Sequence, residues 1–423
     1  MVKSILLAAG EGTRLKPITE TRPKSMVPVL CKPVLEWHLE ALINVVEDIY
    51  IVVGYMKDYV KKYLESRNLL GNKVKLIDQG TLRGSGDAVV KASRVIGPGE
   101  DVLVVYSDIF VGDWSIIPNM ASIDGNLVVG VELSDVSDYG ALYCKGQFLE
   151  KIVEKSESGG PGIVNAGIYK LNTSDILENG DVQPSPRGEI ELTDIVNRIV
   201  SQKGVRVIIA NTEWVDIGKP WNLIEANKIA LKRIKSEIKG KVIEPVRIVG
   251  EVFVDKDSTI YPYTTIEGPS YIDKGVEIGP SAYIRPWSVI CNGSKIGFSV
   301  EVKESVLFEN VHSHHLSYIG DSVICENVNL GAGTIIANLR FDEKTVKVLI
   351  KGTLVDSKRR KLGAIIGANV RTGVNVSIMP GVKIGSNSWI LPGTVVYRDV
   401  PSNVIYPSTR SIKSASENYE PRI

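Results

Sequence analysis

The stretch LLAAGEGTRL, residues 6–15, decides how the first part of this chain folds. The apolar residues 4–9 predict a buried strand, and the glycines after them predict a tight turn. Glycines let backbone N–H groups approach phosphate oxygens closely, and Arg14 and Lys24 add two positive charges nearby. A bare Gly-x-Gly turn after a strand also occurs in dinucleotide loops, so the glycines alone do not identify the ligand.

Length and charge set the first limits. The chain has 423 residues, enough for two cores, and its 50 basic and 49 acidic residues nearly balance. This balance predicts no nucleic-acid or membrane surface. No apolar run reaches the length of a membrane span, residues 5–9 are too short for a signal peptide, and the cysteines lack the paired spacing of a zinc site. We therefore expect a cytoplasmic protein.

Two hydrophobic patterns divide the chain. Up to about residue 231, short apolar segments alternate with amphipathic ones, which predicts an α/β domain, Rossmann-like with a mainly parallel sheet. The expected strands cover residues 49–53, 74–77, 102–106 and 127–131, and the expected helices residues 34–45, 56–67, 87–95 and 220–238.

The second pattern is a six-residue repeat. Aliphatic residues recur at every sixth position from Ile248 to Val302, and the repeat resumes from Ile366 to Val396. Hexapeptide periodicity is typical of an all-β parallel β-helix, in which each hexad forms one side of a three-sided coil. Interruptions at residues 312–317 and 340–363 are expected to loop out of the coil, and the second is rich in lysine and arginine.

These patterns predict the domain boundaries. An α/β domain covers residues 1–235, a linker residues 236–247, the β-helix residues 248–407 and a polar tail residues 408–423.

The opening stretch, followed by Pro23-Lys24 and PVLCKP at residues 28–33, resembles the signature of sugar-1-phosphate nucleotidylyltransferases. The resemblance implies catalytic roles for Arg14 and Lys24. It implies that nucleotide is bound by Leu7, Ala8, Ala9, Gly10, Gly12, Thr13, Gln79, Gly84 and Ser85. A glutamine amide such as that of Gln79 can both donate to and accept from a pyrimidine edge.

Two aspartates are the candidates for a metal site. Asp108 follows the strand expected at residues 102–106, and Asp216 lies near the end of the same domain. Either alone equally fits an ordinary turn, but the resemblance implies that both hold Mg²⁺, an ion that uses one or two carboxylates plus substrate phosphates. Sugar-phosphate contacts are implied for Gly140, Glu154, Lys155 and Asn165, although such sequences are also common at strand ends.

Four segments of the repeat region resemble bacterial bifunctional enzymes that make UDP-N-acetylglucosamine. They are IRP at 284–286, EVK at 301–303, HLSYIGD at 315–321 and NLGAGT at 329–334. The resemblance implies a left-handed β-helix, a homotrimer, and acetyl-CoA as the acetyl donor to an amino-sugar 1-phosphate.

Acetyl transfer to a sugar amine needs a base, and histidine, with an ordinary pKa of ~6.5, can serve near neutral pH. His315 is the candidate base, Asn338 is a second catalytic candidate, and the backbone at Ala332 is the candidate acetyl-CoA contact. The implied sugar-phosphate contacts are Arg285, Lys303, Tyr318, Asn329, Lys344 and Lys347.

The chain departs from the bacterial pattern at NLRFD, residues 338–342, and at its metal aspartate, which is similar to that of thymidylyltransferases. The variant pattern is similar to that of archaeal bifunctional sugar-1-phosphate nucleotidylyltransferase/acetyltransferases. UTP or dTTP, and glucosamine or galactosamine 1-phosphate, remain open as substrates. A second hypothesis is a glucose-1-phosphate thymidylyl- or uridylyltransferase whose coil serves only for trimerisation.

Overall fold

The computed structural model describes residues 2–71, 73–154, 159–186 and 188–407. The chain divides into two compact units. The first unit comprises Met1–Leu15 and Arg22–Ala230, and the second comprises Lys16–Thr21 and Leu231–Ile423. Among the described residues, no helix combines the length and the apolar character that crossing a membrane requires.

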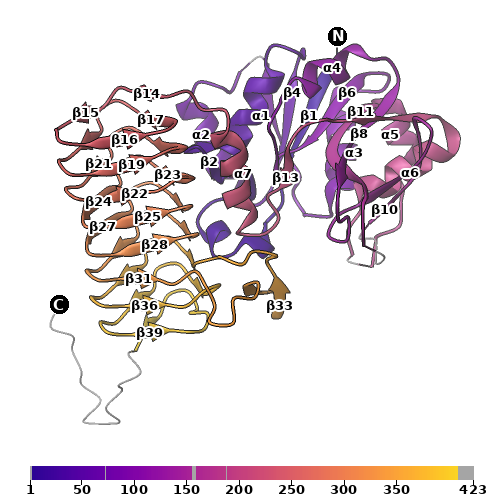
Figure 1. The fold of residues 1–423 in the computed structure, drawn as a ribbon. Helices are drawn as coiled ribbons and strands as arrows, with labels where there is room; N and C mark the ends of the chain where they lie inside the picture. The colour runs from indigo at the N-terminus through magenta and orange to yellow at the C-terminus, as the bar shows by residue number, and fades with distance from the viewer. Residues whose placement is uncertain (1, 72, 155–158, 187, 408–423) are drawn as a thin grey trace. The chain divides into compact units, whose positions relative to one another are not determined.

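A nine-stranded sheet forms the centre of the first unit, in the order β5-β4-β1-β6-β11-β8-β12-β10-β9 (Figure 1). Its strands are β1 (Lys3–Ala8), β4 (Ile49–Val53), β5 (Val74–Asp78), β6 (Asp101–Tyr106), β8 (Asn126–Leu133), β9 (Ala141–Lys145), β10 (Phe148–Val153), β11 (Gly162–Asn172) and β12 (Val205–Ile209). The four strands from β5 to β6 are parallel, as expected, but β11 lies antiparallel between β6 and β8. The sheet is therefore mixed. The hairpin of β9 and β10 adds another antiparallel pair, since a tight turn can join only antiparallel strands.

Helices pack on both faces of this sheet. They are α1 (Val34–Leu42), α2 (Lys57–Ser66), α3 (Ser85–Ile96), α4 (Ile116–Ser122), α5 (Thr173–Asn179) and α6 (Leu192–Gln202). A further helix, α7 (Asn222–Leu231), contacts the segment after β2 (Pro28–Val29), where Leu30 N donates to Asn227 Oδ1 at 2.8 Å. Neighbouring residues of β1 enter different cores: Leu6 packs with Leu35 of α1, and Ile5 packs with Val89 of α3. Burial on both faces explains why these strands are almost continuously apolar.

The second unit is a parallel coil of three sheets, which the chain visits in rotation (Figure 1). The first coil sheet contains β14 (Glu237–Ile238), β17 (Val252–Val254), β20 (Ser270–Ile272), β23 (Ser288–Ile290), β26 (Val306–Leu307), β29 (Val323–Ile324), β34 (Ile365–Ile366) and β37 (Lys383–Ile384). The second contains β15 (Lys241–Val242), β18 (Thr259–Ile260), β21 (Glu277–Ile278), β24 (Lys295–Phe298), β27 (His312–His315), β30 (Asn329–Leu330), β35 (Arg371–Thr372), β38 (Trp389–Ile390) and β40 (Ile405–Tyr406). The third contains β16 (Arg247–Val249), β19 (Thr265–Glu267), β22 (Tyr283–Ile284), β25 (Glu301–Lys303), β28 (Tyr318–Gly320), β31 (Ile335–Ile336), β36 (Ser377–Ile378) and β39 (Val395–Val396).

The aliphatic residues of the hexads fill the interior of this coil, as the repeat predicts. Ile260 and Ile278, which pair on the second coil sheet, and Ile366 and Ile384, which pair on the first, are all completely buried there. Because every turn presents the same apolar positions, successive turns form one continuous core.

Two predicted interruptions have different outcomes. Residues 312–317 do not leave the coil, because β27 pairs with β24 below and β30 above. Residues 340–363 do leave it, and they contain the hairpin of β32 (Lys347–Ile350) and β33 (Thr353–Asp356), while β29 pairs directly with β34 across the insertion. The predicted linker is also wrong in part: β14 and β15 lie within residues 236–247 and pair with β17 and β18, so this segment starts the coil.

A column of asparagines marks one corner of the coil. All five members have a left-handed backbone, and each side-chain amide donates to the next at 2.9–3.2 Å. The column consists of Asn310, Asn327, Asn369, Asn387 and Asn403. Asparagine tolerates this conformation better than other residues with a side chain, which explains its recurrence.

Candidate functional site

A short antiparallel ladder brings the two predicted metal aspartates together in the first unit. The strands β7 (Ile109–Val111) and β13 (Trp214–Asp216) pair so that Asp216 faces Ile109, next to Asp108. The Lys24 ammonium contacts both carboxylates, closely at Asp108 and at 3.4 Å from Asp216 Oδ1. Three residues far apart in sequence thus form one charged group.

The charges of this group shift one another's protonation. Burial would lower the pKa of Lys24, but the two carboxylates outweigh it and raise that pKa. Burial raises the pKa of Asp216, and the neighbouring Asp108 carboxylate raises it further. For Asp108, burial is outweighed by Lys24, so its pKa is lowered. Two carboxylates this close, one of them disfavoured as an anion, suit a divalent cation.

A cavity of about 180 Å³ opens beside these carboxylates. Seven of the predicted site residues line it: Arg14, Ser85, Asp108, Gly140, Glu154, Asn165 and Asp216. Eight other residues line it without a predicted role, among them Tyr106, Asp138, Glu191 and Trp214. Trp214 could have been suspected from its place two residues before Asp216, whereas Glu191 lies in no recognisable motif.

The predicted phosphate loop lies where β1 ends. Gly12 has a φ of +67°, and its carbonyl accepts a hydrogen bond from Leu15 N at 2.9 Å. This turn leads into a short 3₁₀ helix, Thr13–Leu15, which carries Arg14. A Cβ at Gly10 would meet nothing within 4 Å, which leaves the backbone there open to a ligand. Leu7 and Ala8 are the last residues of β1, Ala9 follows the strand, and Thr13 is the first residue of the 3₁₀ helix.

The predicted base-binding residues lie where β5 ends and α3 begins. Gln79 is 3% exposed, and its amide nitrogen donates to Gly84 O at 2.9 Å and to Asp87 Oδ2 at 3.0 Å. Gly84 has a φ of +105°, and a Cβ there would lie 2.4 Å from Ile190 O, so only glycine fits. The Gln79 amide nitrogen thus donates both of its hydrogens within the protein, to Gly84 and to Asp87.

The predicted sugar contacts are brought together only in part. Asn165 lines the cavity, and its amide donates to Tyr169 at 2.5 Å and accepts from Gly167 N at 3.0 Å. Glu154 also lines the cavity, next to Gly140. Lys155 lies outside the described residues.

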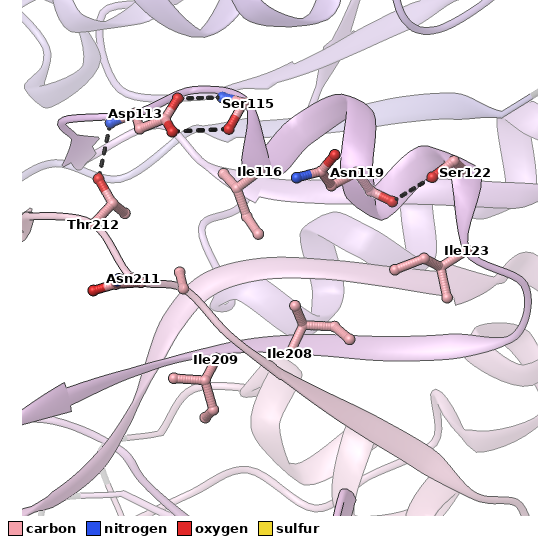
Figure 2. Close-up of a pocket in the computed structure, with 11 residues that line it drawn as sticks. Asp113, Ser115, Ile116, Asn119, Ser122, Ile123, Ile208, Ile209, Asn211 and Thr212 are labelled. Carbon is pink, nitrogen blue, oxygen red and sulfur yellow. Dashed lines mark hydrogen bonds between the residues drawn. The ribbon is translucent and has the colours of Figure 1, made fainter.

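A larger hollow of about 360 Å³ lies elsewhere in the first unit, between α4 and the segment after β12 (Figure 2). It contains none of the predicted site residues. The Asp113 carboxylate accepts bonds there from Ser115 N and Ser115 Oγ, both at 2.9 Å, and isoleucines form much of the wall. Size alone therefore does not identify the candidate site; the convergence of charged groups in the smaller cavity does.

At the third coil sheet, three predicted residues, Lys303, Asn338 and Tyr318, form a cluster around one buried carboxylate. Asp321 is 1% exposed; its two oxygens accept from Lys303 Nζ at 3.0 and 2.9 Å, and Oδ2 accepts from Asn338 at 2.5 Å. Asn338 also donates to the Tyr318 hydroxyl at 3.0 Å. Arg285, whose place in the ladder adjoins that of Lys303, is paired with Glu301 at 2.8 Å.

Gly320 makes this arrangement possible. A Cβ there would lie 2.5 Å from the Tyr318 hydroxyl and 2.7 Å from Asn338 Nδ2. The absence of a side chain lets both groups lie over the backbone.

The remaining predicted residues lie apart from this cluster. His315 and Asn329 belong to the second coil sheet, where His315 is exposed and pairs with Phe298. Ala332 is at a corner, where its carbonyl accepts from Asn375 N at 2.8 Å. Lys344 and Lys347 lie in the insertion and are exposed.

Three residues of the cluster had no predicted role: Asp321, Glu304 and Arg359. Asp321 lies at the end of the matched segment 315–321, so the motif could have suggested it. Arg359 comes from the insertion and contacts Glu304 closely and Asp321 at 3.7 Å. No local pattern places an insertion residue on the coil.

Comparisons with known proteins agree with this geometry. The nucleotidyl transferase family matches residues 3–233, and the GMPPB C-terminal domain matches residues 266–360. The bifunctional sugar-1-phosphate nucleotidylyltransferase/acetyltransferase of Sulfurisphaera tokodaii is 46% identical over 403 residues, which cover 94% of this chain and 98% of the relative. The chain belongs to this family.

Other relatives that are named bifunctional are similar over nearly the whole chain. The bifunctional protein GlmU of Methanocaldococcus jannaschii is 40% identical over 404 residues, covering 95% of this chain and 96% of the relative. A solved UDP-glucose pyrophosphorylase in complex with UDP-glucose covers 55% of this chain and 99% of its own, with a TM-score of 0.50 and 24% identity. That likeness shows the fold of the nucleotidyltransferase half.

Proposed function

We propose that this chain is a bifunctional enzyme of UDP-N-acetylglucosamine synthesis. The coil acetylates glucosamine 1-phosphate, and also galactosamine 1-phosphate, with acetyl-CoA. The α/β unit then joins the product to UTP and releases pyrophosphate, with dTTP as the alternative nucleotide. The observation that carries the proposal is similarity over 94% of the chain to a relative named for both activities.

In the α/β unit, an oxygen of the sugar phosphate attacks the α-phosphorus of the nucleotide, and the bond to the departing pyrophosphate breaks. Asp108 and Asp216 would hold Mg²⁺, which supplies charge neutralisation when bound. Arg14 and Lys24 neutralise the triphosphate, and the backbone of residues 7–13 cradles it. Gly140, Glu154, Lys155 and Asn165 bind the sugar phosphate, and Gln79, Gly84 and Ser85 bind the base.

In the coil, the sugar amine attacks the thioester carbon, and the thiolate of coenzyme A leaves. His315 removes the ammonium proton beforehand, and Asn338 and Asn329 orient the reacting groups. Arg285, Lys303, Tyr318, Lys344 and Lys347 bind the sugar phosphate. The backbone at Ala332 contacts acetyl-CoA.

We further propose that the coil is a left-handed β-helix and that three copies assemble through it, acting in the cytoplasm. Exposed apolar side chains beside His315 and Tyr318 support an assembly: Phe298, Leu316 and Ile335 are 47%, 59% and 41% exposed. Apolar groups gathered around a candidate site suit a surface that a second copy covers.

The decisive experiment incubates the protein with acetyl-CoA and glucosamine 1-phosphate and follows the free thiol. The proposal expects thiol release that His315→Ala abolishes while pyrophosphate formation persists. Absence of thiol release at every pH would instead favour the glucose-1-phosphate nucleotidylyltransferase with a non-catalytic coil. Thiol release unchanged by His315→Ala would remove the assignment of the base.

A further inference from the structure

The Gln79 side chain is held in one orientation by acceptors alone. Its amide nitrogen donates to the backbone oxygen of Gly84 and to the carboxylate of Asp87. Neither partner can donate a hydrogen bond, because a carbonyl and an ionised carboxylate only accept. The amide nitrogen must therefore face these two groups, and the carbonyl oxygen Oε1 is the remaining polar atom of the side chain.

Asp87 is itself fixed. It lies in the first turn of α3, where a negative charge is favoured by the helix dipole. Lys91, one turn later, pairs with it at 3.2 Å and also donates to the backbone oxygen of Gln79. The three residues close a ring of contacts that holds the carboxylate against the amide.

We propose that Asp87 is a positioning residue that sets base selectivity by fixing which atom of the Gln79 amide faces the nucleotide. An outward Oε1 accepts from a ring N–H. Uracil and thymine present such a donor at N3, as guanine does at N1, whereas cytosine and adenine present an acceptor. The site therefore takes oxo-bases with a ring N–H and rejects CTP and ATP. This inference rests on the proposed base contact of Gln79.

The test is a nucleotide panel with N-acetylglucosamine 1-phosphate and Mg²⁺, following pyrophosphate. For the wild type, kcat/KM for UTP and dTTP is expected to exceed that for CTP by at least about tenfold, because a buried acceptor facing another acceptor is left unpaired. In Asp87→Asn, the new amide can donate as well as accept, so Gln79 can turn over. The UTP-to-CTP ratio of kcat/KM should then fall by about tenfold.

Glu65→Gln is the matched control. Glu65 and Lys61 form another i,i+4 ion pair in the first unit, 3.9 Å apart, more than half exposed and on a different helix. Its removal should leave the ratio unchanged. If circular dichroism shows that Asp87→Asn is unfolded, Asp87→Ala, which keeps the Gly84 acceptor, should give an intermediate ratio.

Two results would overturn the inference while leaving the proposed function intact: equal use of UTP and CTP by the wild type, or an unchanged ratio in a folded Asp87 variant. Absence of pyrophosphate with every nucleotide would instead contradict the proposed function.

Discussion

The ammonium of Lys303 is held by both oxygens of the Asp321 carboxylate, at 3.0 and 2.9 Å. The two residues lie on successive turns of the coil, and Asp321 N donates to Lys303 O at 2.8 Å. One nearly buried carboxylate thus holds both the Lys303 ammonium and the Asn338 amide.

Asp321→Asn should weaken acetylation. Lys303 would lose a charge-assisted partner, so KM for glucosamine 1-phosphate should rise about tenfold, and the free energy of unfolding should fall by about 3 kcal/mol. Steady-state kinetics and urea unfolding measure the two effects. Asp342→Asn removes an exposed carboxylate of the same unit, paired with Arg340 at 2.8 Å, and should change neither. Unchanged kinetics in Asp321→Asn would show that the cluster does not serve the site.

Asp108→Asn should abolish pyrophosphate formation and leave thiol release intact. The carboxylate contacts Lys24 and adjoins Asp216, whereas the acetylation candidates belong to the other unit. Both activities are measured on the same preparation, so each reports whether the protein is folded. Loss of both with an unchanged circular dichroism spectrum would contradict two separate sites.

His38 should make stability depend on pH. Its Nδ1 lies 2.7 Å from the oxygen of Val34, so this nitrogen carries the proton, while burial lowers the pKa of the ring to about 4. The unfolded chain binds a proton near its ordinary pKa of ~6.5, and the folded chain does not until about 4. Stability is therefore lost as pH falls through this window, by about 3 kcal/mol at pH 4.

The comparison that isolates this effect is the difference in urea unfolding between pH 7 and pH 4 for the wild type and for His38→Gln. Fluorescence is a suitable probe, because the His38 ring lies edge-on to Trp114 at 4.9 Å. His315→Ala, at an exposed histidine, should keep the wild-type dependence. An equal dependence in His38→Gln would show that other groups cause it.

Asn369 separates backbone strain from side-chain bonding in the corner column. It accepts from Asn327 at 3.2 Å and donates to Asn387 at 2.9 Å, with a φ of +59°. Asn369→Gly and Asn369→Ala both remove the two bonds, but alanine keeps the Cβ in the left-handed region whereas glycine has none, a difference of about 1–2 kcal/mol. Thermal unfolding of both variants should therefore rank alanine below glycine; the reverse order would show that strain is negligible.

Local repetition explains what could be predicted of the fold. Each hexad meets the same surroundings, so its buried aliphatic residue is visible in the sequence. Strands such as β4 and β6 are visible for another reason, because burial on both faces of the sheet makes them continuously apolar. The start of the coil was missed because Val242 alone continues the spacing before Ile248, and one residue makes no repeat. The antiparallel β11 was missed because its pairing depends on strands far away in sequence.

The candidate sites divide in the same way. Lys24, Asp108 and Asp216 could be predicted from motifs, because each of them follows a strand or turn that the sequence reveals. The structure brings these three residues together. The contact of Arg359 with Asp321 depends on how an insertion folds back, which no local pattern encodes. The orientation of the Gln79 amide could not be predicted from the sequence either, because it depends on hydrogen bonds to two acceptors on the other side of a loop.

The strand register of the coil sets the distances between its candidate binding groups. Arg285, Lys303 and Gly320 occupy one column of the third sheet, one residue per turn, so their spacing is set by the distance of about 4.8 Å between neighbouring strands. Loss or duplication of a whole turn would move a binding group by one fixed increment without disturbing the others. A scaffold of this kind can be adapted to a longer or shorter ligand by changing its number of turns.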